Sequence, residues 1–441
     1  MTSIVDRRGF MKVAASAGAG LGLATSLGRA MAGKANDKIV VGVMGTGGRG
    51  TGLAKLFEQQ PEVEVAYVCD VDKHRVDHAV AEVNQVKGRT PKAVTDFRNI
   101  LDDKSVDALV IATCNHWHAP ATILACAAGK HVYVEKPCGH NPREGELLVD
   151  AQRKANRVVQ MGTQRRSSPR AIEAVQAIRE GVIGRPYLAR AWYANRRKSI
   201  GLGKAAPVPS GLDYELWQGP APRAPYRDNV IHYNWHWFRR WGTGEICNNG
   251  THEIDVARWA LGVDYPVRVT SVGGRYHFED DWEFADTQQA GFEFAGQRAI
   301  VWQGLSCNPF PTENRGRGTI VHGTTGTVVM DQDGYTVYDL DHKVVKESIA
   351  PAVADPLAPS GDDQLTALHI ANFVEAVRTG APVTQPIAEG AKSVLLCHLG
   401  NIAQWTGRAL RIDPQSGHVQ GDDQAMGYWQ REYAPGWTPV V

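Results

Sequence analysis

Short apolar runs alternate with amphipathic stretches over the N-terminal part of the chain. Runs rich in Val, Ile and Ala occupy residues 39–43, 63–69, 107–113 and 131–134, and a stretch with helical periodicity follows each of them. Continuous apolar runs of this length are typical of strands that are buried on both faces. The alternation therefore predicts an α/β domain built on a doubly wound parallel sheet, with ligands at the carboxyl ends of its strands.

The pattern changes beyond residue 186, where β-branched and aromatic residues gather in stretches that are separated by Gly-containing turns. These stretches are 187–194, 267–276, 288–294, 298–305, 319–321 and 327–330. Helical periodicity returns at 363–378 and 389–400. The pattern predicts a second, α+β domain with a large, mostly antiparallel sheet. Residues 201–227 are rich in Pro and Gly and indicate an irregular insertion that could wall a cleft.

A glycine-rich loop follows the first apolar run and precedes a helical stretch at 51–59. Its residues are Gly45, Thr46, Gly47, Gly48, Arg49 and Gly50. Strand, G-x-G-x-x-G and helix in this order predict a dinucleotide site, with the phosphates at the helix N-terminus. The second run ends in Asp70, roughly 20 residues beyond the loop, where a carboxylate can accept hydrogen bonds from the adenosine ribose. Because Asp70 would repel a 2′-phosphate, the pattern favours NAD over NADP.

The N-terminal 32 residues have the composition of a targeting segment. A twin arginine, Arg7-Arg8, precedes a weakly apolar Gly/Ala-rich run and an A-x-A site at 30–32. The run is shorter than the roughly 20 apolar residues of a membrane span. We therefore expect a twin-arginine export signal at 1–32 and a periplasmic mature protein without a membrane span. The alternative is a disordered basic N-terminus.

The predicted domains behind that segment are a dinucleotide-binding domain at 33–163 and a substrate domain at 164–441. The 441 residues carry a net charge of +1, and no basic stripe supports binding to nucleic acid. The seven cysteines include no C-x-x-C pair, so we expect neither a disulfide framework nor a zinc site. His232 and His236 lie four residues apart but lack an H-E-x-x-H context, and no metal is expected.

Several motifs together resemble the Gfo/Idh/MocA family of sugar-oxidising enzymes, which includes glucose–fructose oxidoreductase and inositol dehydrogenase. The resembling segments are 45–50, 69–72, 112–118, 129–137 and 250–255. The resemblance implies a cis bond before Pro137, which would aim Lys136 into the cleft. It also implies a homo-oligomer, a dimer or tetramer, because the exposed face of the second sheet is often a subunit contact in relatives.

Polar residues at the predicted strand ends are candidates for contacts with the coenzyme near its nicotinamide. They are Asn115, His118, Glu135, Lys136 and Gln164. Parallel strands end at one edge of a sheet, so these side chains are expected to meet there.

A second chemical centre is expected where a helix begins near Thr251. His252 would lie in its first turn, where the helix dipole lowers the pKa of imidazole and favours the neutral base. The resemblance implies that this histidine exchanges the proton of the substrate, with an aspartate four residues earlier. This chain has Asn248 there, which can orient the imidazole but cannot stabilise imidazolium. By itself such a histidine is more often structural, but Lys136 and the resemblance favour catalysis.

The aromatic segment 232–241 follows the insertion and supplies candidates for substrate contacts. They are Tyr233, His236, Trp237 and Arg239, to which we add Arg165. Aromatic faces stack on the C–H faces of sugar rings, and Arg and His donate hydrogen bonds. A packed aromatic cluster that holds the insertion in place explains the same pattern equally well.

The expected function is an NAD-dependent oxidoreductase with tightly bound coenzyme, acting on a CH–OH group of a sugar, polyol or glycoside. One alternative is a redox-neutral, NAD-dependent glycosidase that oxidises its substrate transiently, eliminates the aglycone, adds water and reduces the product. Tyr233 or His236 would then supply an extra base. A second alternative is a sugar-binding protein without catalysis.

Overall fold

The apolar runs of the N-terminal part pair into a six-stranded parallel sheet in the order β3-β2-β1-β4-β5-β6. Its strands are β1 Ile39–Met44, β2 Val63–Cys69, β3 Lys92–Val94, β4 Ala108–Ile111, β5 His131–Val134 and β6 Val159–Met161. The doubly wound sheet is therefore confirmed. The computed structural model describes residues 38–349 and 361–441, so the expected signal at 1–32 lies outside the described residues.

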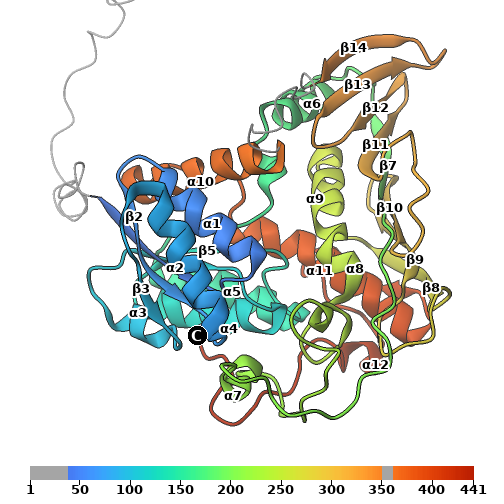
Figure 1. The fold of residues 1–441 in the computed structure, drawn as a ribbon. Helices are drawn as coiled ribbons and strands as arrows, with labels where there is room; N and C mark the ends of the chain where they lie inside the picture. Colours follow the sequence, from blue (N-terminus) through green and yellow to red (C-terminus); the bar gives the residue numbers. More distant parts are fainter. Residues whose placement is uncertain (1–37, 350–360) are drawn as a thin grey trace, which may run out of the picture. The chain divides into compact units, whose positions relative to one another are not determined.

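Helices cover both faces of this sheet (Figure 1). They are α1 Gly48–Gln59, α2 Lys73–Lys87, α3 Arg98–Asp102, α4 Asn115–Ala127 and α5 Pro142–Ala155. Helices α1 and α2 pack on one face, together with α10 (Gly361–Thr379) from the C-terminal part of the chain. Helices α3, α4 and α5 pack on the other face, together with α11 (Ile387–Thr406). The C-terminal helices thus complete the first domain as well as the second.

Helix α4 begins earlier than its pattern suggests. The sequence pattern predicts a helix over 119–128, but α4 starts at Asn115 and contains Pro120. Proline has no N–H, so the carbonyl four residues earlier loses its usual donor. That carbonyl belongs to His116, and it accepts a hydrogen bond from the Arg431 guanidinium at 2.7 Å. A distant arginine therefore makes this helix start possible.

The second sheet has nine strands in the order β14-β13-β12-β11-β7-β10-β9-β8-β15. They are β7 Pro186–Ala194, β8 Arg268–Gly274, β9 Thr287–Phe294, β10 Arg298–Leu305, β11 Arg317–Gly323, β12 Gly326–Met330, β13 Gly334–Asp339, β14 Val344–Ile349 and β15 Leu410–Arg411. Strands β7 and β10 pair in parallel, and the other pairs are antiparallel. The mostly antiparallel sheet is confirmed, although the sequence pattern did not predict β13, β14 and β15.

Helices pack on one face of this sheet around the largest apolar core of the described residues. The other helical elements of the second part of the chain are η1 Gln164–Ser167, α6 Pro169–Arg179, α7 Tyr214–Gln218, η2 Asn234–Trp237, α8 Gly244–Asn248, α9 Gly250–Leu261 and α12 Asp423–Met426. The sequence pattern predicts that Ile254, Ala257 and Trp259 point inward from this helix; Ile254 and Ala257 are fully buried, and Trp259 is partly buried against the same core. The helix that carries the candidate histidine is therefore anchored in the core.

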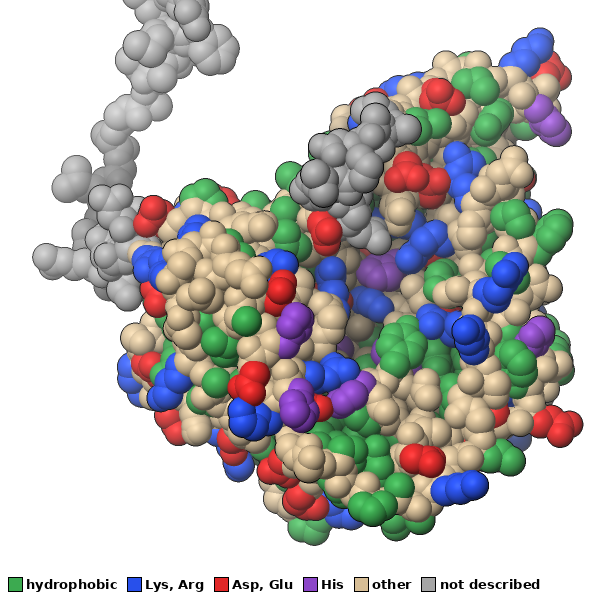
Figure 2. All heavy atoms as spheres, in the orientation of Figure 1, with side chains coloured by type: hydrophobic (Ala, Val, Ile, Leu, Met, Phe, Trp, Pro, Cys, Tyr) green, Lys and Arg blue, Asp and Glu red, His purple; other side chains and the backbone are tan. Residues whose placement is uncertain are grey.

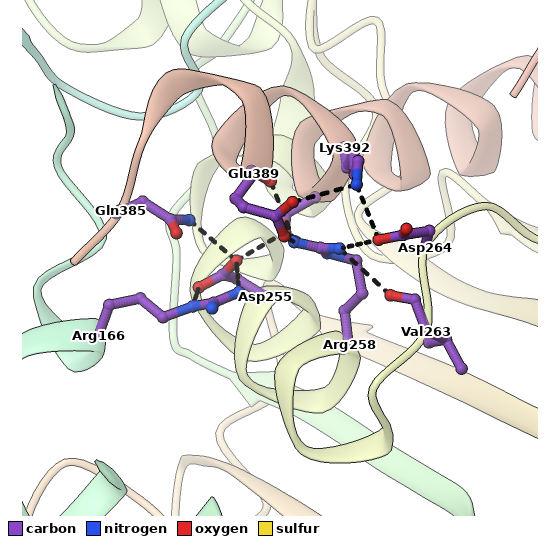
Figure 3. Close-up of polar contacts among 9 residues, drawn as sticks. Arg166, Asp255, Arg258, Val263, Asp264, Gln385, Glu389 and Lys392 are labelled. Carbon is purple, nitrogen blue, oxygen red and sulfur yellow. Dashed lines mark hydrogen bonds and ion pairs between the residues drawn. The ribbon is translucent and has the colours of Figure 1, made fainter. Parts of the chain in front are cut away.

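A buried polar network fixes α9 against α11 (Figure 3). Asp255 accepts two hydrogen bonds from Arg166, at 2.7 and 2.8 Å, and another from Gln385 at 3.0 Å. One turn further, Arg258 pairs with Glu389 of α11. Breaking the Arg166–Asp255 pair, which is buried on both sides, costs about 3–5 kcal/mol, because it leaves a charge without compensation. The network therefore holds the start of α9 in one position.

Candidate active site

A cavity of about 650 Å³ lies at the carboxyl ends of the first sheet and is lined by residues of both domains. In the same orientation as Figure 1, Figure 2 shows a hollow in which Lys or Arg and His side chains gather beside apolar ones. Predicted site residues that line the cavity are Gly45, Gly47, Gly48, Arg49, Asp70, Asn115, His118, Glu135, Lys136, Gln164, Arg165, Tyr233, His236, Asn248 and His252. The structure thus brings both groups of candidates, from segments far apart in the chain, to one cavity.

The glycine loop has the close approaches that a phosphate cradle needs. Gly45 has a φ of +85°, and a Cβ there would lie 2.7 Å from the carbonyl oxygen of Ala112. A Cβ on Gly50 would lie 1.7 Å from the carbonyl oxygen of Gly45, so α1 can start against the strand only with glycine. Gly50 itself does not line the cavity, and Thr46 lines a smaller neighbouring one. The residues present therefore fit a dinucleotide.

Asp70 directly follows β2 and lines the cavity. Its Oδ2 accepts hydrogen bonds from the backbone N–H of Thr46 at 2.7 Å and from its hydroxyl at 3.3 Å. Its Oδ1 accepts from the N–H of Asp72 at 3.0 Å. Burial raises the pKa of Asp70, and the two backbone donors oppose this. The carboxylate is thus held in place at the cavity wall, where it can accept from ribose hydroxyls.

Lys136 reaches the cavity from the end of β5, and the expected cis bond before Pro137 is confirmed. Its ammonium group donates to the backbone oxygen of Asn248 at 2.7 Å and to the Asn248 side-chain oxygen at 3.0 Å. Burial lowers the pKa of Lys136 to about 8, and the neighbouring Arg317 adds to this effect while Glu135 opposes it. The side chain is therefore a partly buried cation that loses its proton at mildly alkaline pH.

Asn248 is hydrogen-bonded to Lys136, and among the described residues no hydrogen bond joins it to His252, which corrects the role expected for it. Its amide nitrogen donates to Glu245 at 3.3 Å, and this fixes the side-chain oxygen toward the lysine. Glu245 is buried and also pairs with Arg197. A carboxylate one turn earlier in α8 thus orients the amide, and the amide orients the ammonium group. Neither Glu245 nor Arg197 is among the residues predicted for the site.

His252 lies in the first turn of α9, as expected, and faces the same cavity. Among the described residues, its ring has no hydrogen-bond partner. The pKa of His252 lies well below 6.5, first because the ring is buried and then because Lys136, Arg317 and Arg165 are close. Burial and these cations explain the low pKa better than the helix dipole alone. The ring is a neutral imidazole that is available to accept a proton.

Two arginines flank this histidine and share one carboxylate. Glu253 is fully buried, and it accepts hydrogen bonds from Arg317 at 2.7 Å and from Arg165. One Nη atom of Arg165 is buried without a hydrogen-bond partner. Arg165 was predicted, whereas Arg317 was not, because only the pairing of β11 with β7 brings it here. The local charge is therefore positive and resists protonation of the imidazole.

The candidate residues near the expected nicotinamide hold one another in place. Glu135 pairs with Arg49 at 2.8 Å and accepts from Gln164 at 3.3 Å. The His118 ring lies between the carbonyl oxygens of Pro137 and Thr113, at 2.6 and 3.1 Å. The contact with Pro137 ties the start of α4 to the turn that presents Lys136.

Some residues of the aromatic segment 232–241 line the cavity, and others are packed in the core or lie away from the cavity. Tyr233 and His236 line the cavity, and Tyr233 accepts a hydrogen bond from Arg197 at 3.0 Å. Trp237 is only 1% exposed and stacks on Trp282 at 3.9 Å, so it is a core residue. The Arg239 guanidinium lies 4.5 Å from the Trp405 ring, away from the cavity. The structure does not bring Trp237 and Arg239 to the site.

The described residues were also compared with the requirements of metal sites and of membrane spans. No group of three or more His, Cys, Asp or Glu side chains in residues 38–349 and 361–441 is arranged to hold a metal ion. Over the same residues, no helix combines the length and apolarity that crossing a membrane requires.

Two family models match the chain over most of the lining of this cavity. Residues 39–163 match the model of the Gfo/Idh/MocA family described as an oxidoreductase family with an NAD-binding Rossmann fold. Residues 191–304 match the C-terminal alpha/beta domain of an oxidoreductase family.

Individual relatives match over shorter stretches. A Glycosyl hydrolase family 109 protein of Saccharopolyspora erythraea is 34% identical over 34% of this chain and 38% of its own length. An inositol 2-dehydrogenase of Salmonella typhimurium is 26% identical over 51% of this chain and 55% of its own. The solved structure of a levoglucosan dehydrogenase with NADH and levoglucosan has a TM-score of 0.67 at 19% identity, covering 85% of this chain and 99% of that one. The last likeness establishes the fold.

Proposed function

The chain belongs to the Gfo/Idh/MocA family of oxidoreductases, whose first domain binds NAD, and on that premise we propose that it oxidises a CH–OH group of a sugar, polyol or glycoside. One observation carries the proposal. An ammonium group, Lys136, and a neutral imidazole, His252, line the same cavity as the glycine loop and Asp70. A hydroxyl-bearing carbon beside the nicotinamide would meet both groups.

Each residue has a distinct part in the proposed reaction. NAD, when bound, supplies the hydride acceptor. His252 accepts the hydroxyl proton, because its low pKa keeps it neutral. Lys136 donates a hydrogen bond to the same oxygen and stabilises the negative charge that develops there. Asn248 and Glu245 keep the ammonium group in position. The apolar and aromatic lining excludes water and presents rings to the sugar.

A redox-neutral glycosidase is the second candidate. Tyr233 and His236 line the cavity together with Lys136 and His252, so a further proton-transfer group is at hand. Burial lowers the pKa of His236 to about 3, which leaves it neutral over the physiological range. A relative named Glycosyl hydrolase family 109 protein supports this candidate. Carbohydrate binding without catalysis is the third candidate.

Incubation of the purified protein with a panel of sugars and aryl glycosides, with and without added NAD, separates these candidates. Accumulation of NADH indicates a dehydrogenase. Release of aglycone without net NADH indicates a glycosidase. Binding without either product would overturn the proposed oxidation and leave a carbohydrate-binding protein.

The coenzyme preference should depend on Asp70. Replacing Asp70 with alanine should weaken binding of NAD by about tenfold, because the hydrogen bonds from the ribose to a charged group are lost. It should weaken NADP less, because the repulsion of the 2′-phosphate disappears at the same time. Titration of coenzyme-free protein with both nucleotides measures the ratio. An equal loss for both would remove Asp70 from the ribose site.

We also propose that the protein is exported through the twin-arginine route and acts in the periplasm. The support is the sequence of residues 7–32, and a route that carries folded proteins allows NAD to be bound before export. Replacing Arg7 and Arg8 together with lysine should abolish recovery of the protein from the periplasm. Fractionation of cells checks this, and normal periplasmic recovery of the double variant would contradict it.

A further inference from the structure

The insertion between β7 and α8 contacts the first domain beside Asp70. The N–H of Lys73 donates to the carbonyl of Gly211 at 2.9 Å, and the N–H of Asp213 donates to the carbonyl of Val71 at 2.9 Å. Asp72 and Leu212 between them form an antiparallel bridge. The insertion is therefore hydrogen-bonded to the turn that directly follows the ribose-binding position.

Apolar side chains of the insertion extend the cavity at this end. Leu212, Leu216 and Trp217 line it together with Val71 and Phe97 of the first domain. Leu212 and Trp217 belong to a buried cluster of the insertion, and Leu216 packs against the core around Phe97. An apolar lining beside the ribose anchor Asp70 suits a flat base such as adenine.

Further contacts hold the insertion in this position. The Trp217 carbonyl accepts a hydrogen bond from the Trp117 indole at 3.1 Å, which joins α7 to α4. The Pro220 carbonyl accepts from the N–H of Ala434 at 3.0 Å. At the rim, His232 Nε2 lies 3.1 Å from Asp72 Oδ2. The insertion is thus fixed from three sides.

We propose that residues 209–217 and His232 form the outer wall of the adenosine pocket and retain NAD through turnover. Release of the coenzyme then requires the wall to separate from the turn after β2. The proposal rests on the proposed function only in needing a dinucleotide site, and it does not depend on which substrate is oxidised. It goes beyond the glycine loop and Asp70, because it assigns coenzyme contacts to the second domain.

The test measures retention of NAD and not turnover. Protein purified with its coenzyme is dialysed against an excess of an NAD-consuming enzyme, and the NAD that remains is extracted with acid and quantified over time. The wall variant combines Leu212→Ala with Leu216→Ala. The matched control is Leu202→Ala, because Leu202 lies in the same insertion, is 73% exposed and does not line the cavity.

The wild type and the control should keep their NAD through the dialysis. The wall variant should release it at least about tenfold faster, because the apolar contacts with the base are lost. A second variant, His232→Ala, alters only a rim residue and should accelerate release about two- to fivefold, as expected for a partly exposed pair. It keeps the test valid if the double variant does not fold.

Two results would overturn the proposal that these residues retain NAD. One is a wild type that loses its NAD as fast as the wall variant, and the other is unchanged retention in both variants. Either result leaves the proposed oxidation intact if added NAD still supports it. Failure of the protein to bind NAD at all would instead overturn the proposed function itself.

Discussion

Replacing Lys136 with alanine should lower turnover by about 10²–10³-fold while the coenzyme stays bound. Removing one preorganised donor to a developing oxyanion has a cost of this size. The ammonium group contacts the backbone and side-chain oxygens of Asn248 and lines the cavity, so its loss alters the chemistry more than the fold. Turnover with saturating substrate, alongside the NAD content of the purified variant, separates the two effects. Lys136→Arg should restore little, because a planar guanidinium is no substitute for a compact ammonium group.

The pKa of Lys136 also predicts in which direction turnover changes with pH. Lys136 must carry its proton to stabilise alkoxide, and its pKa is about 8. Turnover should therefore fall as the pH rises through about 8, and this alkaline limb should be absent in the alanine variant. Asn248→Asp places a carboxylate against the ammonium group, which favours the charged form. The limb should then move to higher pH. A limb that stays in place in both variants would show that another group titrates.

Replacing His252 with alanine should lower turnover by about 10²–10⁴-fold, the range of general acid–base catalysis. Because the pKa of His252 lies well below 6.5, the wild type should keep full activity through neutral pH. Turnover should fall only at distinctly acidic pH, where the imidazole gains a proton and can no longer act as a base. The acidic limb should disappear in the variant. Measurement of turnover from acidic to neutral pH for both proteins checks this.

A matched comparison guards against a proton acceptor elsewhere in the cavity. Tyr233→Phe removes a tyrosine hydroxyl of the cavity and its hydrogen bond from Arg197, but it leaves His252 in place. If the proposal is correct, this variant keeps the acidic limb. If the limb persists in His252→Ala, a group other than His252 accepts the proton.

The first domain could be predicted closely because its strands are buried on both faces and its loop has a fixed spacing. The run at 131–134 coincides with β5, and the loop and Asp70 line the cavity together. The start of α4 could not be predicted, since it depends on Arg431, about 300 residues away from the carbonyl it satisfies. Local sequence contains no trace of that contact.

The sequence predicts most of the polar residues that line the site, but not the hydrogen bonds between them. Lys136 and His252 each lie in a recognisable motif, and both line the cavity. The partner of Asn248 was predicted incorrectly, because the orientation of an amide depends on what surrounds it. Glu245 fixes that orientation from one turn earlier. A glutamate on a short helix gives no signal of such a role until the helix is placed opposite β5.

The position of β7 has a consequence for how the chain folds. This strand lies inside the nine-stranded sheet, yet both of its neighbours come much later in the chain. Leu188 pairs with Ala299 and Ala191 pairs with Thr319, so the pairings close loops of about 110 and about 130 residues. Non-local pairing of this kind slows folding, because chain entropy is lost before the contacts compensate for it. The first sheet can assemble from neighbouring segments. Strand β7, in contrast, stays unpaired on both edges until β10 and β11 have been synthesised. That interval is when the chain is most open to mispairing and aggregation.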